Sequence, residues 1–259
     1  MITHNATNAQ AVSTSDPVTQ SITCASSVRL LVVMITVGGA TTRTGGAPTY
    51  NGTDLTQAST TTYYATSPET NIEMWYLINP PTGSAYNVSI PNNGSLEVSL
   101  ITSSFSPDLG ASVAFIDAQS NTGVSTAPGS ATHSDYHYED LMVAMFASGS
   151  DSTATYCTGT QLITQQDRGT YIAGAAYRQF SFMTIPTAYS ISWGNLTSED
   201  WSVVSAVFRE VVDSSNVEVA KVVGHVVIEP YGLQVSKVVG YVVLKDWVPA
   251  SGIQFFLIV

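Results

Sequence analysis

The sequence has few charged residues. Asp, Glu, Lys and Arg make up 10% of the 259 residues, whereas an average soluble domain has roughly 25%. Eight Lys and Arg stand against 19 Asp and Glu, which gives a formal net charge of -11. Because an acidic chain repels phosphate backbones, we expect no nucleic acid partner. So few charges also predict a surface covered mainly by Ser, Thr, Asn and Tyr.

Cysteine is scarce, since Cys24 and Cys157 are the only two. A disulfide between them requires that the two side chains meet in space, and sequence spacing does not determine this. The interpretation that we favour is that both are small buried residues. The sequence alone leaves both possibilities open.

Long hydrophobic runs are also missing. The strongly apolar stretch 28–37 (VRLLVVMITV) ends after ten residues, and a membrane helix needs about 20. We therefore expect no membrane insertion and predict a strand that is buried on both faces. The first ten residues have neither a basic start nor an apolar stretch, so no signal peptide is expected.

Runs of helix-forming residues are lacking, whereas Thr, Val, Tyr and Ser are abundant. Apolar residues alternate with polar ones in 86–90, 96–100 and 189–193, which indicates half-buried strands. The sequence PNNG at 91–94 predicts a hairpin between the first two of these strands. Many short strands separated by Gly, Pro and Asn predict an all-β fold, an antiparallel β-sandwich of jelly-roll-like type with almost no helix.

The sequence divides into three regions. We predict an N-terminal arm over residues 1–18, a β-sandwich domain over 19–210 and a C-terminal strand repeat over 211–259. The polar link 211–216 (VVDSSN) marks the second boundary, and all three lysines of the chain follow it.

The C-terminal region contains two near copies of one valine-rich strand, in 217–232 and 233–247. Strands with valine on both faces must be covered on both faces, and an isolated two-stranded ribbon is marginal in water. We therefore predict that this region joins copies of the chain into a homotrimer, with a local hairpin packed on the sandwich as the alternative. The residues expected at these contacts occupy matching places in the copies: Val219, Val223, Gly224, Val235, Val239 and Gly240.

One stretch has the residue types of a metal site. His133, Asp135, His137 and Glu139 would project to one face of an extended chain, and imidazole with carboxylate suits Zn²⁺ or a similar ion. Same-face neighbours lie about 7 Å apart along a strand, so they converge only where the chain bends. We predict a polar loop without a metal. A metal-dependent hydrolase that uses His133 and His137 is the alternative.

Several motifs of catalysis and cofactor binding are absent. The sequence has no G-x-S-x-G elbow, P-loop, dinucleotide fingerprint or EF-hand loop. We therefore expect no cofactor, no catalytic residues and no enzymatic activity.

Aromatic residues are the better candidates for ligand binding. Tyr63 and Tyr64 lie in a Ser/Thr-rich stretch, and Trp75 follows in an apolar one. Their rings could stack on sugars, so we name these three as candidate glycan-binding residues. Trp193 and Trp201 lie in alternating strands and are predicted to be core residues.

Four segments in order carry a resemblance to a known module. They are 46–59 (GAPTYNGTDLTQAS), 72–90 (IEMWYLINPPTGSAYNVSI), 138–147 (YEDLMVAMFA) and 189–208 (YSISWGNLTSEDWSVVSAVF). Together they resemble a jelly-roll-like β-sandwich module of bacterial surface proteins and of phage tail or fibre proteins, over roughly residues 19–209. The tail segment KVVGYVVL resembles valine-rich segments at the ends of phage structural proteins. The resemblance implies a binding or structural role with no fixed catalytic set.

These observations lead to one expected function and one alternative. We expect a non-enzymatic phage virion structural protein, as a fibre, tail or capsid-decoration component. Its partners would be its own copies, other virion proteins and a host-surface glycan. The alternative is a carbohydrate-binding module that acts in host adsorption or belongs to a secreted, extracellular bacterial protein.

Overall fold

The computed structural model describes most of the first 211 residues and a few of the last 48. The described residues are 1–38, 43, 45–63, 70–94, 96–108, 110–125, 131–134, 140–148, 156–157, 161–167, 172–179, 189–191, 193–194, 199–211, 217–218, 228–229, 232–233 and 243–244. They contain strands and no helix, and all strand pairs are antiparallel. The predicted all-β antiparallel fold is confirmed.

Residues 1–108, called the N-terminal half below, form one central sheet and one cover sheet. The central sheet has the order β1-β9-β3-β7-β6 and the cover sheet the order β2-β8-β4-β5. The central strands are β1 (Thr3–Ser13), β9 (Glu97–Ser106), β3 (Leu30–Gly38), β7 (Thr70–Ile78) and β6 (Thr56–Tyr63). The cover strands are β2 (Val18–Thr23), β8 (Ala85–Ile90), β4 (Thr49–Tyr50) and β5 (Thr53–Asp54).

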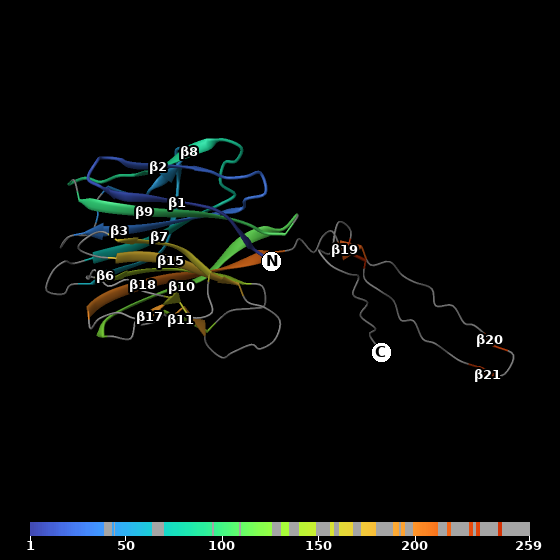
Figure 1. Ribbon diagram of the computed structural model, residues 1–259. Coiled ribbons are helices and arrows are strands. Elements are labelled where there is room, and N and C mark those ends of the chain that lie inside the picture. The colour runs from blue at the N-terminus through green and yellow to red at the C-terminus, as the bar shows by residue number, and fades with distance from the viewer. Residues whose placement is uncertain are drawn as a thin grey trace. The chain divides into compact units, whose positions relative to one another are not determined.

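Residues 112–211, called the C-terminal half below, form the second central sheet in the order β10-β18-β12-β15-β14. Its strands are β10 (Ser112–Ser125), β18 (Glu199–Val211), β12 (Leu141–Ser148), β15 (Ile172–Gln179) and β14 (Gln161–Asp167). Two short pairs accompany it: β11 (Thr132–His133) with β16 (Tyr189–Ser190), and β13 (Tyr156–Cys157) with β17 (Trp193–Gly194). Figure 1 shows the two central sheets stacked between the cover strands β2 and β8 on one side and β11 and β17 on the other.

The two central sheets have the same strand order when each is numbered along its own half. Across each sheet, the neighbouring strands are the first, last, second, fourth and third central strands of that half. The register agrees as well, since Leu30 lies opposite Phe105 and Leu141 lies opposite Phe208. The C-terminal half therefore repeats the central sheet of the N-terminal half.

Two irregularities of the sheets repeat at the same places, whereas a further shift in β1, between Gln10 and Ser13, has no counterpart in β10. The first strand of each central sheet has a register shift beside the equivalent phenylalanine, between His4 and Ala6 in β1 and between Phe115 and Asp117 in β10. The outer strands β6 and β14 each have another shift, at 57–59 and at 162–164. Because a β-bulge inserts a residue at one defined position, matching bulges are strong evidence that the two halves share one plan.

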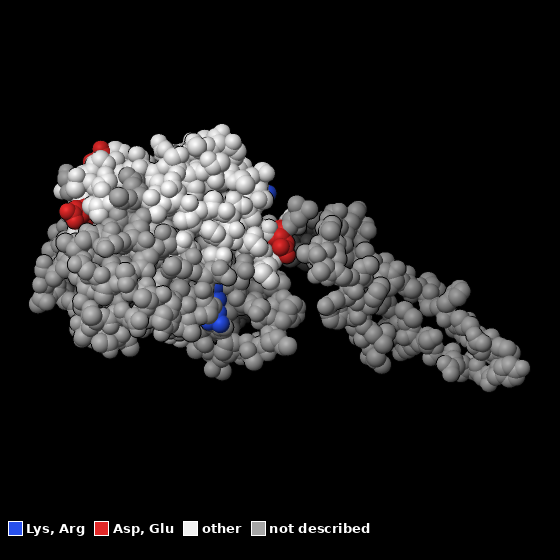
Figure 2. All heavy atoms as spheres, viewed as in Figure 1, with Lys and Arg blue, Asp and Glu red and all other residues white. Residues whose placement is uncertain are grey.

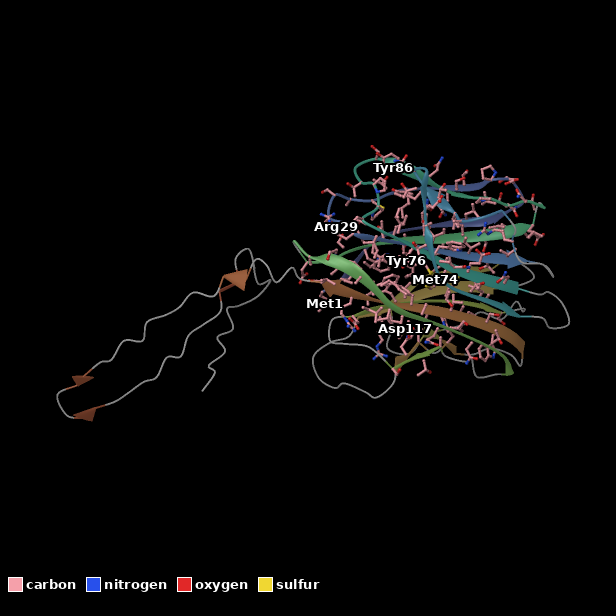
Figure 3. All side chains as sticks on the ribbon, turned by 180° about the vertical axis from the view of Figure 1, so that it is seen from behind. Met1, Arg29, Met74, Tyr76, Tyr86 and Asp117 are labelled. Atoms are coloured by element: carbon pink, nitrogen blue, oxygen red, sulfur yellow. The ribbon has the colours of Figure 1, made fainter. Side chains whose placement is uncertain are left out.

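Three apolar layers fill the fold. One lies between the two central sheets, and the others cover their outer faces. Figure 3 shows Met74 and Tyr76 in the middle layer, with Tyr86 and Asp117 toward opposite outer sides. The strand predicted at 28–37 to be buried on both faces is confirmed, since β3 is buried from Leu30 to Val37.

Two predictions about 86–100 need correction. The turn at 91–94 does not close a hairpin, because β8 pairs with β2 and β4, whereas β9 pairs with β1 and β3. The chain crosses from the cover sheet to the central sheet there. The segment 96–100 is also not half-buried, since Ser99 is buried. Val98 and Leu100 face the cover sheet, whereas Ser99 lies on the other face of β9, with Ile101 and Phe105. The second central sheet covers that face, and alternation in the sequence does not reveal such a cover.

The predicted N-terminal arm is part of the sandwich. Thr3–Ser13 form β1, which pairs along β9 at the edge of the first central sheet. Residues 1–108 and 112–211 form one compact unit, and 109–111 with 212–259 form a second. An edge strand tolerates polar side chains on its open faces, so a polar segment such as this one can belong to the sheet.

Four short strands are described in the region 212–259. They are β19 (Val217–Glu218), β20 (Ile228–Glu229), β21 (Gly232–Leu233) and β22 (Val243–Leu244). β19 pairs with β22 and β20 with β21, both antiparallel and in the same register, because the residue numbers of each pair of partners add to the same total. The described part of the tail therefore folds back on itself.

Candidate functional site

His133 is the centre of a buried chain of hydrogen bonds. Its Nδ1 lies 3.0 Å from Asp117 Oδ2 and its Nε2 lies 2.7 Å from Ser205 Oγ. β11 contributes the histidine, β10 the aspartate just after its bulge, and β18 the serine. His133 is fully buried and Ser205 is 1% exposed, whereas the Asp117 side chain is 32% exposed.

The electrostatics of this chain favour a neutral imidazole. Burial lowers the pKa of His133, and the opposing effect of Asp117 does not restore it. Burial also acts to raise the pKa of Asp117, but hydrogen bonds from Gln119 and His133 outweigh it and the pKa lies below its usual value. A carboxylate only accepts hydrogen bonds, so Nδ1–H donates to Asp117 and the Ser205 hydroxyl donates to Nε2.

Ser, His and Asp in this order are the groups of an acyl-transfer triad. A nucleophile must reach its substrate, yet Ser205 lies inside β18, which pairs with β10 on one side and β12 on the other. Its hydroxyl is buried beneath the strand that carries His133. The geometry provides the hydrogen bonds of a triad without access for a substrate.

The N-terminal half has a matching link without a histidine. Thr102 in β9 has the same place as Ser205 in β18, three positions from the equivalent phenylalanine. The hydroxyl of Thr102 donates to Gln20 Oε1 at 2.9 Å, and Gln20 belongs to the cover strand β2. His133 in β11 occupies the place of Gln20, since both neighbour a Thr–Ser strand pair. We conclude that, in each half, a polar contact at this position joins an outer strand to the central sheet.

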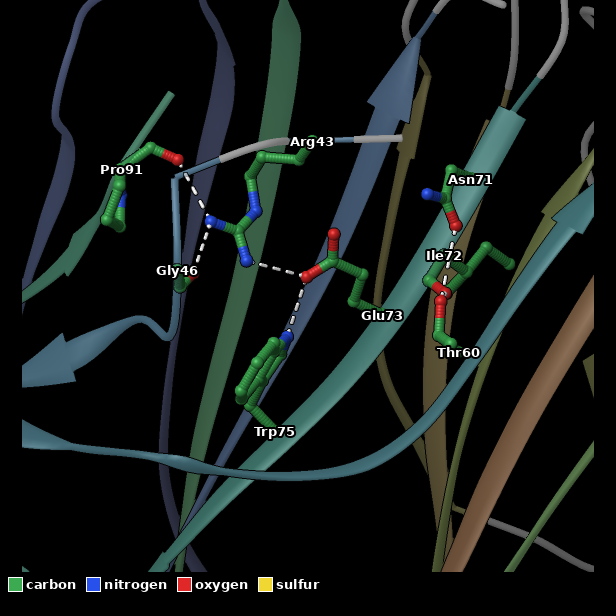
Figure 4. A network of polar contacts seen from close by, with 8 residues as sticks. All are labelled: Arg43, Gly46, Thr60, Asn71, Ile72, Glu73, Trp75 and Pro91. Atoms are coloured by element: carbon green, nitrogen blue, oxygen red, sulfur yellow. Dashed lines mark hydrogen bonds and ion pairs between the residues drawn. The ribbon is translucent and has the colours of Figure 1, made fainter. Parts of the chain in front are cut away.

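A second buried network joins Arg43, Glu73 and Trp75 on the outer face of the first central sheet (Figure 4). Arg43 donates to Glu73 Oε2 at 2.8 Å and to the carbonyl oxygens of Gly46 and Pro91 at 2.9 Å each. The indole N–H of Trp75 donates to the same Glu73 oxygen at 2.7 Å. The Arg43 and Glu73 side chains are 3% and 6% exposed. The network therefore ties β7 to the loop before β4 and to the end of β8.

The candidate glycan residues do not form one site in the described structure. Trp75 is 9% exposed, and its ring lies 5.8 Å from the Arg43 guanidinium carbon. Its ring belongs to the core under the cover sheet and offers no open face for a sugar. Tyr63 ends β6 and its side chain is not described, and Tyr64 lies outside the described residues.

Of the four metal candidates, His133 alone is described. Both of its ring nitrogens are engaged by Asp117 and Ser205. Asp135, His137 and Glu139 lie outside the described residues. In the part of the chain that the structure describes, no group of three His, Cys, Asp or Glu is placed to hold a metal ion.

The cysteine prediction is tested at Cys24 alone, because the side chain of Cys157 is not described, whereas the tryptophan prediction is tested at both positions. Cys24 is a free, buried thiol, so the alternative of a disulfide to Cys157 is not realised. Burial raises the pKa of Cys24 despite its hydrogen bond with Tyr50. Trp193 and Trp201 are core residues, as predicted.

The six predicted assembly residues lie outside the described residues: Val219, Val223, Gly224, Val235, Val239 and Gly240. Over the described ranges, no helix has the length and hydrophobicity that a membrane crossing requires.

Sequence analysis missed the partners in both polar networks. It named His133 but neither Asp117 nor Ser205, because strands far apart in the sequence bring them together. It also missed Arg43 and Glu73. An acidic residue inside the apolar stretch 72–78 was an available signal, since a buried carboxylate needs a partner.

Comparisons of the chain with protein-family models, with curated proteins and with solved structures found no match.

Proposed function

We propose that the chain is a non-enzymatic structural protein of a phage virion, a fibre, tail or capsid-decoration component. In this proposal the sandwich faces outward and residues 211–259 join three copies of the chain and attach them to other virion proteins. The observation that carries the proposal is the valine-rich repeat of the tail.

The pairing of the described tail strands supports this role. β19 with β22 and β20 with β21 fold the tail on itself in one register. A ribbon of two strands leaves two faces to be covered, and the tail sequence carries valine at consecutive positions. Equivalent ribbons of neighbouring chains can cover each other, and each buried valine contributes about 1.5–3 kcal/mol.

The strand order supports a jelly-roll-like sandwich in the N-terminal half. There the order β1-β9-β3-β7 faces the order β2-β8-β4-β5. The chain crosses between the two sheets from β1 to β2 to β3 and again from β7 to β8 to β9, and such crossings also occur in the jelly rolls of viral capsid and lectin domains. The polar links at Ser205 and Thr102 favour a scaffold over catalysis, because one of them contains no group that titrates near neutral pH.

Deletion of Val217–Val259 tests the proposal. The truncated chain should be a folded monomer by circular dichroism and light scattering, whereas the full chain has three times the mass of one copy. Val223→Asp with Val239→Asp should dissociate the assembly in the same way, and Thr19→Asp on the exposed cover sheet is the matched control. An unchanged oligomeric mass after the deletion would contradict the assembly role.

One surface favours the second candidate function, glycan binding. Thr19, Ser21 and Thr23 of β2 and Asn87 of β8 are exposed on the outer face of the cover sheet. Figure 2, which views the cover sheet from its edge, shows few charged side chains on the described surface around β2 and β8. Hydroxyl and amide groups can bind the hydroxyls of a neutral sugar. A glycan array should detect a ligand that Ser21→Asp abolishes, and no signal from any neutral glycan would exclude this candidate.

A further inference from the structure

We infer that the sandwich is a fused dimer: its two halves are copies of one module, and the interface between them is of the kind that binds a second copy of a chain. The shared strand order, register and bulges show that the halves have one plan. The interface adds independent evidence, because its aromatic contacts occur twice with the halves exchanged.

A cluster of three aromatic rings lies at one place in the interface. Tyr76 of the N-terminal half stacks on Phe115 of the C-terminal half at 5.0 Å, with an interplanar angle of 7°. Its edge meets Phe208 at 5.5 Å and 72°. Phe115 and Phe208 themselves lie edge to face at 5.9 Å. Tyr76 of one half thus contacts two aromatic rings of the other half.

A second cluster repeats the first with the halves exchanged. Tyr177 of the C-terminal half stacks on His4 of the N-terminal half at 5.2 Å and 23°. It meets Phe105 at 5.8 Å and 76°, and His4 and Phe105 lie edge to face at 5.4 Å. The strand pairs make Phe105 the equivalent of Phe208, and His4 the equivalent of Phe115.

The edges of the sheets follow the same exchange. β6 packs against β10, and β1 packs against β14. β1 is the equivalent of β10 and β6 of β14, so exchanging the halves converts one contact into the other. An interface in which i contacts j and j contacts i is isologous, the arrangement of twofold protein dimers.

The apolar rows that meet at this interface are also alike. Leu30, Val32 and Met34 line it in β3, and the equivalent row in β12 has Leu141, Val143 and Met145. Both halves therefore present the same Leu-x-Val-x-Met pattern to the middle layer. Each half thus offers its partner the same central row of apolar side chains.

The halves hold together by packing, not by shared strands. Every strand pair described in the sheets of residues 1–211 lies within one half. The two halves are joined by the short segment 109–111, which lies outside their compact unit. Cutting this segment breaks no strand pair, so the two pieces should remain bound as two chains would.

The fit is asymmetric. β18 packs against β6 and β7, and β12 packs against β7, whereas the exchanged pairs, β9 with β14 and β15 and β3 with β15, make weaker contacts in the described structure. Ile72 and Met74 in β7 correspond to Ala173 and Ala175 in β15. All four lie in the middle layer. Two N-terminal halves would crowd this layer and two C-terminal halves would leave it underfilled, so each half prefers the other as its partner.

The test cuts the full-length folded chain between the halves. A protease recognition sequence replaces Leu109–Gly110, and native mass spectrometry follows the two pieces. They should stay in a one-to-one complex after cutting. When isotopically heavy and light cut proteins are mixed, unfolded and refolded, heavy and light pieces should pair at random. The same recognition sequence at the exposed Asn51–Gly52 turn is the control, because that cut divides one half and should abolish refolding.

Separation of the pieces would overturn the inference, as would failure of the cut protein to refold where the uncut protein refolds. Equal behaviour of the two cuts would overturn it as well. A variant of the uncut chain gives a second test. His4→Phe converts the second aromatic cluster into the first and should raise Tm by about 2–4 °C, whereas His4→Leu should lower it. A decrease in Tm as large for His4→Phe as for His4→Leu would also contradict the inference of a fused dimer. The test follows pairing of the halves, so its result does not depend on assembly through the tail.

Discussion

The two halves of the sandwich share a backbone plan and differ in how they bind their outer strands. In the N-terminal half, Gln20 accepts a hydrogen bond from Thr102. In the C-terminal half, His133 and Ser205 occupy the same places, and Asp117 extends the chain of hydrogen bonds. The fold therefore requires a polar pair at this position, and the side chains that supply it can change. A titratable residue entered only one half.

The buried ion pairs, in contrast, are not shared between the two halves. Arg43 and Glu73 tie down the cover sheet of the N-terminal half, but the place of Glu73 in β15 holds Gly174. The C-terminal half has its own pair, in which Arg209 binds Asp140 through two hydrogen bonds of 2.9 Å. These pairs lie at different places, so they are additions to the shared plan.

Breaking the buried pair of the N-terminal half should have the largest effect. Arg43→Ala leaves the Glu73 carboxylate buried without its charge partner, which typically costs about 3–5 kcal/mol of unfolding free energy. The double variant Arg43→Met, Glu73→Leu should recover most of this loss, because it leaves no buried charge. Urea unfolding measures both. A double variant as unstable as Arg43→Ala would show that the carbonyl contacts at Gly46 and Pro91 dominate.

A steric difference between the halves gives the next effect. A Cβ at Gly123 would lie 2.5 Å from the Trp201 ring, so Gly123→Ala should destabilise the chain by about 1–3 kcal/mol. The equivalent strand pair in the N-terminal half joins β1 to Val98, where the side chain is smaller than Trp201. Gly123→Ala should therefore cost almost nothing when Trp201 is already Val. Equal costs in both backgrounds would contradict this explanation.

Substitution of His133 tests the equivalence of the two polar links. His133→Leu leaves the Ser205 hydroxyl buried without its partner, with an expected loss of about 1–3 kcal/mol. His133→Gln copies the N-terminal half and should lose less than about 1 kcal/mol. Thermal unfolding of the two variants measures these losses of stability. Equal losses for His133→Leu and His133→Gln would show that His133 and Gln20 are not equivalent.

Lowering the pH should destabilise the histidine link of the C-terminal half more than a glutamine link at the same position, and this effect should be smaller than those above. Burial lowers the pKa of His133 below its ordinary 6.5, so folding favours the neutral ring. This contribution to stability is complete above the unfolded pKa and declines as pH falls toward the lowered one. Asp117, whose pKa is below 3.8, loses its contribution only at more acid pH. Between about pH 7.5 and pH 5, the urea midpoint of His133→Gln should therefore fall less than that of the parent chain. His4, whose pKa burial also lowers, stays in both proteins and acts as an internal control.

Sequence patterns predicted single strands better than their partners. The apolar run 28–37 was correctly interpreted as buried on both faces, because valine and leucine at consecutive positions exclude an open face. Alternation in 96–100 did not predict the burial of Ser99, because the second central sheet covers the face of β9 that carries Ser99, Ile101 and Phe105. The repeat of the halves was visible in the segments 30–34 (LLVVM) and 141–145 (LMVAM), but five apolar residues alone do not distinguish a repeat from two ordinary core strands.

The sequence by itself determined the class of the fold. Hydrophobic residues make up 44% of the chain. Because they alternate with polar ones, turn residues separate them and helix formers are lacking, antiparallel strands are the secondary structure that buries them. Only the tertiary structure decided which strands became neighbours, since pairing depends on contacts between residues that are about a hundred positions apart. It placed β1 beside β9, brought Asp117 and Ser205 to His133, and buried Trp75 against Arg43. The physical reason is that hydrogen-bond partners and covered faces belong to whole sheets, whereas local patterns specify only the strands that compose them.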